Sequence, residues 1–463
     1  MKSQKTPSSE DPGLTRRILR SIFAGPIIPY TDRERKRYLI KNLILHFRPY
    51  AVPEKTLKFT LTWGLGGMAA VLVLIQIASG VMLKFTYEPT PVAAYASIQA
   101  MQHNVAFGQL IRNIHHWSAN FLVVIALLHM MRVFFSGAFH PPRQFNWIIG
   151  LGLFSFVLAA NFTGYLLPYD QLAYWAVTVS TGMLEYIPVI GIQLQEIVRG
   201  GGDIGPATLR IFFAIHTTIV PVGLIILMAF HFWRVRKAGG LVMPRAPKEE
   251  IEEKPTLLPT MPNLLLRETV TALVLIAGVL TISVFFNAPL DDPANPGLSP
   301  NPTKAPWYFM GFQEILLHFH PLTALFFIPF LMIIGLVSIP YIYYPLNTAG
   351  VWFTSLKGRR MALEATAASS ILTPVGIFAD EYVMDFAAWI PALSPVISNG
   401  LIPLGIVLAG FFGFHLFLKR RYSANKNEVV QTIFVFIVTA FIILTLTGIW
   451  FRGSAMRLTW PSP

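Results

Sequence analysis

Long stretches without any charged side chain constrain this chain more than any other feature of its sequence. Eight runs contain no Asp, Glu, Lys or Arg: 59–83, 113–131, 144–169, 211–233, 269–290, 315–356, 386–418 and 429–451. Most suit one crossing of a hydrocarbon core about 30 Å thick, and two are longer and must include loop. Only 13% of the residues are charged, roughly half the share in a soluble protein. Because lipid offers the backbone no hydrogen-bond partner, we predict an all-α integral membrane protein with about eight spanning helices.

The N-terminal segment 1–58 differs from the rest because it is polar and contains thirteen Lys and Arg. No apolar core precedes the first span, so the segment does not resemble a secretory signal peptide. The excess of basic residues predicts a cytoplasmic N-terminus. This loop bias accounts for much of the net charge of +13, and the sequence has no nucleic-acid-binding motif.

The chain has no cysteine, which excludes Cys-ligated iron–sulfur clusters and thioether-bound haem. Histidine is the obvious remaining ligand for a redox centre. His115 and His129 have an i, i+14 spacing in IRNIHHWSANFLVVIALLHMMR, and His216 and His231 have an i, i+15 spacing in a second apolar run. At about 100° per residue, both spacings return each pair to roughly the same side of its helix, about 21–23 Å apart along the axis. Two facing helices would then offer one His–His pair near each membrane face, each able to hold the iron of a flat haem.

A single histidine in a membrane helix also has plainer explanations. It can hydrogen-bond a neighbouring backbone group, or it can take part in a proton relay. Two spans that each carry two histidines at nearly the same long spacing favour haem ligation over both. A haem-free transporter whose histidines relay protons remains the alternative from a different functional class.

Glycines repeat the same spacing in two other apolar runs. Gly66 and Gly80 have the i, i+14 spacing, and so do Gly150 and Gly164. Glycine leaves room where a flat macrocycle must press against the backbone. The alternative is that these glycines only help membrane helices to pack, but the match of both pairs to the histidine spacing favours a cofactor.

Two arginines flank the first histidine pair at the expected membrane edges. Arg112 stands three positions before His115, and Arg132 three positions after His129. We expect both guanidinium groups to pair with haem propionates. Ordinary extension of a long basic side chain towards the interface is the alternative.

Three stretches resemble one known family: LIRNIHHWSANF, FTGYLLPYDQLAYWAVTVSTGMLEYIPVIG, and the RK after the second histidine helix. They resemble cytochrome b of the Rieske/cytochrome b complexes, and most of all the plastid type, in which cytochrome b and subunit IV are separate chains. The resemblance is specific over roughly 30–240 and looser from 262 to about 345. The expected organisation is a basic cytoplasmic segment (1–58), a four-helix dihaem domain (59–237), a linker (238–262), a subunit IV-like quinol-site domain (263–345) and a membrane extension (346–463). We expect about four further helices after the first four.

The resemblance implies a cytochrome b subunit of a quinol:cytochrome c oxidoreductase in the bacterial cytoplasmic membrane, contributing to the proton motive force. His115 and His216 would hold a non-covalent b haem near the outer face, and His129 and His231 a second one near the cytoplasm. The substrate would be a quinol, menaquinol or ubiquinol. A Rieske iron–sulfur protein, a c-type cytochrome and a dimeric complex are the expected partners. Arg236 matches a basic residue near the inner quinone site, and an outer quinol pocket would be walled by Tyr165, Tyr169 and Trp175.

The sequence departs from the family at the outer quinol site. The family has a Pro-Glu-Trp-Tyr motif whose glutamate is thought to accept a quinol proton, whereas residues 304–308 read KAPWY and keep only Trp307 and Tyr308. A positioned base would ordinarily help to remove the quinol protons. Glu314 is the nearest downstream carboxylate, and our hypothesis is that it replaces the missing base and acts beside Tyr308. The alternatives are that it marks a helix end, or that the protein is a non-bifurcating electron conduit between quinone and a periplasmic multihaem partner.

Two further positions differ from the family. Gly64 stands about where the plastid type carries the cysteine that binds an extra haem. Ile211 occupies the slot of an arginine near the outer haem, and Arg210 is one position, or about 100°, away from it.

The tail conflicts with the charge rule. With eight spans the C-terminus is cytoplasmic, but LKRRYSANKNE at 418–428 then falls outside. Either the chain crosses the membrane once more near 366–393, or the rule fails here. Asp380, Glu381 and Asp385 argue against a simple span in that stretch.

Overall fold

The computed structural model describes residues 13–15, 17–18, 51–243, 256–344, 352–353 and 355–460. Within these residues, nine helices are long and apolar enough to cross a membrane. The prediction of an all-α membrane protein is therefore confirmed, with five spanning helices after the first four. Two short strands, β1 (Ala51–Pro53) and β2 (Leu257–Pro259), pair antiparallel at one end of the molecule.

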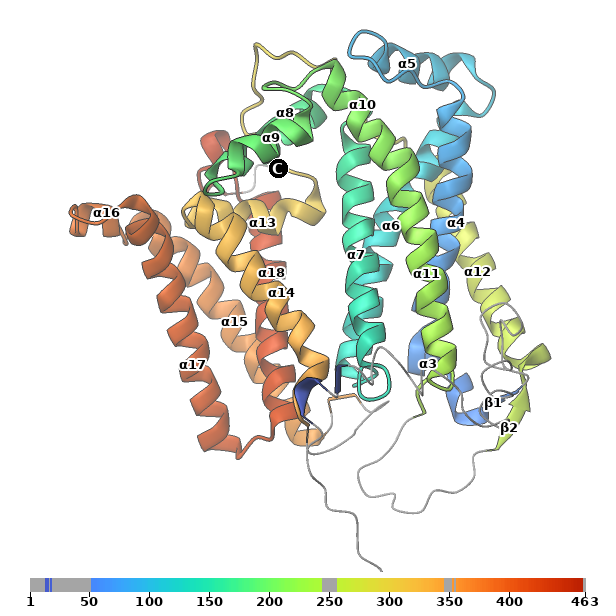
Figure 1. Cartoon of the computed structure of the whole chain (residues 1–463), viewed down its shortest axis with the longest axis vertical. Helices are drawn as coiled ribbons and strands as arrows, with labels where there is room; N and C mark the ends of the chain where they lie inside the picture. Colours follow the sequence, from blue (N-terminus) through green and yellow to red (C-terminus); the bar gives the residue numbers. More distant parts are fainter. Residues whose placement is uncertain are drawn as a thin grey trace, which may run out of the picture.

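Four helical segments stand side by side as an N-terminal bundle (Figure 1). They are α4 (Leu65–Lys84), α6 (Gly108–Phe135), α7 (Gln144–Tyr165) and the continuous segment Pro206–Lys237, which comprises α10 (Pro206–Ala214), η3 (Ile215–Ile219) and α11 (Val220–Lys237). α4 packs against α6, and α7 packs against α11. The bundle is held together by aliphatic side chains from all four segments and from α12: Leu72, Val73, Leu122, Val123, Val157, Val220, Leu224 and Val279.

Short helices cover one end of this bundle, at the top of Figure 1. They are α5 (Ala94–Asn104), α8 (Gln171–Gly182) and α9 (Gly191–Arg199). The opposite end holds the β1–β2 ribbon, η1 (Glu54–Leu57) and α3 (Phe59–Thr62). We call these the α8–α9 end and the β1–β2 end.

The second half of the chain begins with α12 (Thr260–Phe285), which packs beside α4 and α6. The loop after α12 is tied to the first bundle by Asn113, whose side-chain amide donates to the Ser283 carbonyl at 2.9 Å and accepts from the Ala288 amide at 2.8 Å. α13 (Trp307–His318) then crosses the α8–α9 end. The loop therefore fixes where α13 starts relative to the N-terminal bundle.

The C-terminal spans are α14 (Ile328–Ser338, preceded by η4, Thr323–Phe327), α15 (Leu356–Tyr382), α17 (Ile402–Tyr422, preceded by η6, Ile397–Leu401) and α18 (Lys426–Trp450). The shorter α16 (Phe386–Trp389), η2 (Met183–Tyr186), η5 (Ile339–Tyr341) and η7 (Ser454–Met456) connect other elements or end the chain. α18 packs closely on α13, because Gly448 leaves the space that Met310 fills: a Cβ there would lie 2.4 Å from Met310 Cγ. The α18 start is fixed by a capping box in which Asn425 and Glu428 satisfy each other's backbone amides.

The ninth span is α15, which a search for uncharged runs misses. Its charged residues lie towards its two ends, with Lys357 and Arg359 at one and Asp380 and Glu381 at the other, and its centre is apolar. The count of eight spans, with a C-terminus on the side of the N-terminal segment, is therefore corrected. The C-terminus lies at the α8–α9 end, and Lys419 and its basic neighbours lie at the β1–β2 end (Figure 1). The extra crossing removes the conflict with the charge rule.

Candidate functional site

The two histidine pairs face each other between α6 and the η3–α11 segment, one near each end of the bundle. The ring centroids of His115 and His216 are 6.1 Å apart, and those of His129 and His231 are 6.4 Å apart. An iron atom bonded to two imidazoles at about 2 Å each would separate the ring centroids by about 6 Å. Each pair therefore has the spacing of the two axial ligands of one haem iron.

A π turn explains why the i, i+14 and i, i+15 spacings give the same geometry. His216 lies in η3, a one-turn π-helix over Ile215–Ile219 inside an otherwise α-helical span. A π turn takes up one extra residue, so the longer spacing from His216 to His231 covers about the same rise and rotation as the shorter one in an unbroken α-helix. The sequence reasoning assumed regular helices. In regular helices the rotation from the first histidine to the second would differ by about 100° between the two pairs, and the π turn removes that difference.

The α8–α9 pair has its outer ring nitrogens held by hydrogen-bond acceptors. Nδ1 of His115 lies 2.9 Å from Ser79 Oγ, and that hydroxyl donates to the Ile75 carbonyl at 2.7 Å. Ser79 can therefore only accept from Nδ1–H. Nδ1 of His216 lies 3.0 Å from the Ala160 carbonyl. Both rings then keep Nε2 unprotonated, which is the nitrogen that can bind a metal.

At the β1–β2 pair, His231 lacks this support. Nδ1 of His231 is buried and has no hydrogen-bond partner among the described residues. Nearby, Arg132 donates from Nε to the Leu61 carbonyl at 2.7 Å, whereas its buried Nη2 finds no partner in the described part of the chain. A buried, unpaired guanidinium nitrogen is costly, and a propionate would satisfy it.

Each of the four spaced glycines lies against one histidine. A Cβ built on Gly66 would come within 3.2 Å of His129 Cε1, and one on Gly80 within 3.2 Å of His115 Cε1. The same distances are 2.5 Å from Gly164 to His216 and 4.0 Å from Gly150 to His231. The nearest group that these glycines accommodate is therefore the ligand imidazole. Together with the ring spacing and the unpaired Arg132 nitrogen, this cradle fits non-covalent b-type haem.

The other predicted cofactor arginines have different surroundings. Arg112 donates to the carbonyls of Ala288 and Pro289 at 2.8 and 2.5 Å, so both terminal nitrogens hold the α12–α13 loop. Arg236 has a buried Nη1 without a partner among the described residues. Within the described part of the chain, Arg132 Nη2 and Arg236 Nη1 therefore have no hydrogen-bond acceptor, whereas the two terminal nitrogens of Arg112 do.

The KAPWY segment forms the start of α13. Pro306 is the residue before the first turn, and the Ala305 amide donates to Gln313 Oε1 at 2.7 Å. Trp307 Nε1 donates to Asn120 Oδ1 at 2.7 Å, which joins α13 to α6. Tyr308 packs on the core of the N-terminal bundle, and burial raises the pKa of its phenol. The two aromatic residues that the sequence shares with the family therefore face the bundle.

The expected wall of a quinol pocket lies at the same end. Tyr165 ends α7, and Tyr169 belongs to a buried cluster at the α8–α9 end with Trp175 packed against it. Trp175 Nε1 donates to the Asn295 carbonyl at 3.2 Å, and the Ala294 amide donates to the Tyr169 carbonyl at 3.2 Å. The α12–α13 loop thus closes over this region. The structure places no charged side chain at position 211, where the family has an arginine. Ile211 packs in the same apolar cluster, and the neighbouring Arg210 is exposed.

Glu314 lies in a charged cluster that the sequence reasoning missed. Its side chain is fully buried, and Arg452 donates to its two oxygens at 2.5, 3.0 and 3.1 Å. His318 Nε2 lies 3.2 Å from the same carboxylate. Burial raises the pKa of Glu314, but the hydrogen bonds and charges of His318 and Arg452 outweigh it and lower the pKa overall. The partner Arg452 lies far along the chain, after α18, and no local pattern could have indicated it.

Gly64 has a backbone that disfavours any side chain. Its φ is +66°, and a Cβ would lie 2.9 Å from Thr271 Cγ2. A cysteine at this position would therefore require both backbone strain and a shift of the Thr271 side chain.

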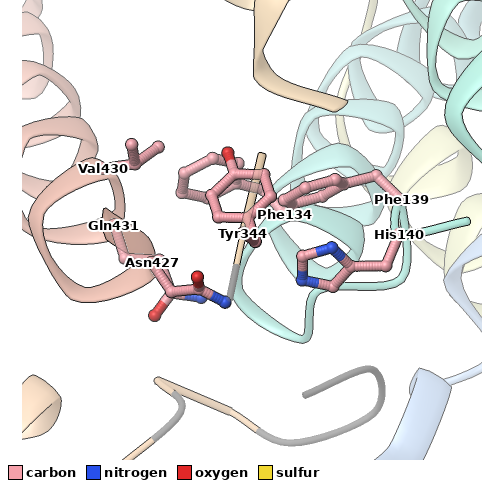
Figure 2. A pocket seen from close by; sticks show the side chains of 7 residues that line it. All are labelled: Phe134, Phe139, His140, Tyr344, Asn427, Val430 and Gln431. Atoms are coloured by element: carbon pink, nitrogen blue, oxygen red, sulfur yellow. The ribbon is translucent and has the colours of Figure 1, made fainter. Parts of the chain in front are cut away.

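One small pocket joins the two halves of the chain near the β1–β2 end (Figure 2). It has room for about one water molecule, which is too little for a quinone ring. Aromatic and polar side chains from the end of α6, the following loop, the segment after η5 and the start of α18 line it: Phe134, Phe139, His140, Tyr344, Asn427, Val430 and Gln431.

Known proteins share the sequence of the N-terminal bundle. The family model "Cytochrome b/b6/petB" matches residues 52–239. Cytochrome b6 of Mastigocladus laminosus is 42% identical over 175 residues, which are 38% of this chain and 81% of the relative. Cytochrome b6 of Synechococcus sp. (strain CC9311) is 38% identical over 211 residues, or 46% of this chain and 95% of the relative. The chain belongs to the cytochrome b family.

The cytochrome b resemblance is thus confirmed, and proteins of this family bind b-type haem and belong to multisubunit electron-transport complexes of the membrane. A solved structure described as "Hyperthermophilic respiratory Complex III" has a TM-score of 0.62 and covers 90% of this chain and 97% of its own. At 24% identity it shows the shared fold alone. The shared fold extends past the N-terminal bundle into the second half of the chain, which is consistent with the expected subunit IV-like part.

Proposed function

We propose that this cytochrome b is the subunit of a quinol:cytochrome c, or related, oxidoreductase that oxidises quinol at the α8–α9 end. The observation that carries the proposal is the presence of two facing histidine pairs, at 6.1 and 6.4 Å, one towards each end of the bundle. When bound there, two b haems supply one-electron transfer across the membrane, which links quinol oxidation to proton motive force. His115 and His216 would hold one iron, and His129 and His231 the other.

The charge distribution supports an orientation. The β1–β2 end carries a surplus of basic side chains in short loops and helix ends, including Lys55, Lys58, Arg132, Arg143, Arg234, Arg236, Lys237, Lys357, Arg359, Arg360, Lys419, Arg420, Arg421 and Lys426. By the positive-inside rule this end would lie in the cytoplasm, which is also where we expect the basic N-terminal segment. The α8–α9 end, with Tyr308 and its neighbours, would face outward in a bacterial cytoplasmic membrane.

The described residues take particular roles in this proposal. Arg132, and Arg236 near the cytoplasmic quinone site, would use their open donors for propionate or quinone oxygens. Arg112 would act chiefly by holding the α12–α13 loop over the outer haem site. Trp307 and Tyr308 would form one wall of the quinol pocket. A Rieske protein and a c-type cytochrome would accept electrons outside, in a dimeric complex that uses menaquinol or ubiquinol.

Glu314 remains our candidate for the missing motif carboxylate, although its geometry changes how it would work. The Arg452 ion pair makes it a weak base on its own, and its hydrogen bond to His318 gives a proton a second acceptor. Glu314→Gln should slow quinol oxidation without loss of haem. Unchanged turnover in that variant would remove Glu314 from the proposal.

Oxidant-induced haem reduction tests the function as a whole. Membranes holding the complex are supplied with quinol, the cytoplasmic quinone site is blocked, and an oxidant pulse is applied while the b-haem absorbance is followed. Transiently increased haem reduction would show that the two quinol electrons separate at the outer site. Simple oxidation of the haems would instead support a non-bifurcating conduit, and absence of any quinol-dependent reduction would contradict the proposal.

A further inference from the structure

Five ionisable side chains form one cluster at the α8–α9 end, outside the histidine pairs. Glu314 and His318 come from α13, Asp380 and Glu381 from the end of α15, and Arg452 from the segment after α18. Arg452 joins Glu314 at 2.5 Å and Glu381 at 2.5 Å, and its side chain is 1% exposed. We call these residues the outer charge cluster. So much buried charge is costly, and membrane-protein groups of this kind commonly serve proton or ion movement.

His318 is hydrogen-bonded on both ring nitrogens. Nδ1 lies 2.7 Å from Asp380 Oδ2, and Nε2 lies 3.2 Å from Glu314 Oε1. Arg452 Nη2 lies 3.3 Å from the same Nε2. The neutral ring can therefore accept from Arg452, and the protonated ring can donate to Glu314, while Nδ1–H donates to Asp380 in both states. Both protonation states of His318 are satisfied without movement of the backbone.

The cluster also leads from the interior to the surface. The exposed fraction of the side chain rises from 0% at Glu314 to 10% at His318 and 30% at Asp380. Among the described residues, Glu314, Asp380 and Arg452 are the charged groups that contact His318, and Glu381 lies on the far side of Arg452. Burial lowers the pKa of His318, but Asp380 and Glu314 outweigh burial and raise the pKa to about 9. A group of that pKa can take a proton from a phenolic hydroxyl, whose ordinary pKa is about 10.

The cluster is mounted on the helix that begins with Trp307 and Tyr308. Along α13, Glu314 lies about 9 Å and His318 about 15 Å from Tyr308. The segment KAPWY offers no carboxylate at the start of this helix. A proton released beside Tyr308 would therefore meet the outer charge cluster as the next ionisable group along the helix.

We propose that His318 relays a proton from the outer quinol site to Asp380 and the external water. The proposal rests on the proposed function, because quinol is the proton donor. The protonated ring first passes its Nδ1 proton to Asp380 and then to water. The remaining Nε2–H is exchanged to Nδ1, and the freed Nε2 takes, through Glu314, the proton that one quinol hydroxyl loses, which restores the protonated ring. The two electrons of the quinol leave through the acceptors already proposed, so the relay carries only protons.

A static clamp is the competing explanation. Arg452 also donates to the Met456 carbonyl, and Glu381 accepts from the Leu458 amide, so the cluster holds the C-terminal residues against α13 and α15. A clamp needs the charges of Glu314 and Arg452 but gives no reason for His318 to change its protonation. The two explanations therefore differ in chemical rescue and in the effect of Asp380.

The test compares three variants in membranes that hold the whole complex. His318→Ala removes the relay, Asp380→Asn removes its exit, and Glu364→Gln is the matched control, a carboxylate near the other end of α15 that is bonded to Tyr422. Quinol oxidation is measured from pH 6 to 9 with and without added imidazole, and haem content is measured for each variant. His318→Gln, which keeps hydrogen-bonding capacity but cannot titrate, replaces His318→Ala if that variant does not assemble.

We expect His318→Ala and Asp380→Asn to slow quinol oxidation at least about tenfold, at the lower end of acid–base effects, with haem content and Glu364→Gln unchanged. Imidazole should restore part of the His318→Ala rate, because it can carry the proton in place of the side chain. Normal turnover of both His318→Ala and Asp380→Asn would overturn the relay. So would a loss of turnover in His318→Ala that imidazole does not restore, if Asp380→Asn oxidises quinol at the normal rate. A wild-type complex that oxidises no quinol would instead contradict the proposed function.

Discussion

Gly164 on α7 lies so close to His216 that a single added methyl group would stand 2.5 Å from the ring carbon Cε1. The equivalent pair at the other end is looser, because a Cβ on Gly150 would be 4.0 Å from His231 Cε1, an ordinary contact. One histidine position is thus defined by the absence of a side chain on the neighbouring helix, and the other is not.

This difference predicts unequal effects of two chemically identical substitutions. Gly164→Ala should displace the His216 ring, cost about 1–3 kcal/mol through overpacking, and deplete the haem at the α8–α9 end. Gly150→Ala should leave both haems in place. Haem content and the optical spectrum of the two purified variants check this, and equal haem loss in both would show that the modest difference in spacing has no consequence.

Ser79 gives a second prediction, about redox potential. Its hydroxyl accepts from His115 Nδ1 and so makes that ligand more electron-donating, which stabilises the oxidised iron. Ser79→Ala should raise the potential of one haem by roughly 20–60 mV, the equivalent of one net hydrogen bond of about 0.5–1.5 kcal/mol. A potentiometric titration should find the other haem unchanged, because Ser79 is at the opposite end of α4 from Gly66 and His129. A shift of both haems, or of neither, counts against this role.

The raised pKa of His318 predicts a particular pH dependence of stability. The pKa in the folded protein is about 9 against an ordinary value of 6.5, so the protonated ring stabilises the fold in full below about pH 6.5 and loses this effect as the pH rises through 9. The difference in thermal stability between wild type and His318→Gln should therefore be largest near pH 6 and shrink towards pH 10. A difference that stays constant over this range would show that His318 does not titrate with folding.

The ninth span predicts which side of the membrane each of two exposed serines faces. Ser423 follows α17 at the β1–β2 end, and Ser454 follows α18 at the α8–α9 end. Because the chain has no native cysteine, Ser423→Cys and Ser454→Cys can each be labelled without background. A membrane-impermeant maleimide should label Ser454→Cys in intact cells and Ser423→Cys only in inverted vesicles. Eight spans would give the reverse pattern, so labelling of Ser423→Cys in intact cells and of Ser454→Cys only in inverted vesicles would contradict the ninth crossing.

Much of the N-terminal bundle could be predicted from the sequence, because ligation of a flat cofactor by two helices requires residues at long, repeated spacings. The spacing of His115 and His129 and of Gly66 and Gly80 expresses that requirement directly. The π turn at His216 could not be predicted, since no local residue pattern specifies it. Its effect on register is visible only once both helices are in place.

The C-terminal half was less predictable for a different physical reason. α15 places its charged residues at both ends, where Asp380 is satisfied by His318 from another helix. Such residues break an uncharged run although the helix still crosses the membrane. The buried pair of Glu314 and Arg452 likewise depends on packing between α13 and the end of α18, which sequence spacing does not encode.

The most direct test of the account is the number of haems held by the purified chain and by two single-histidine variants. We predict two non-covalent, low-spin b haems per wild-type chain, and one in each of His115→Leu and His129→Leu, with different remaining potentials because each variant empties a different pair. One haem or none in the wild-type chain, or two in either variant, would contradict the assignment of the facing histidine pairs.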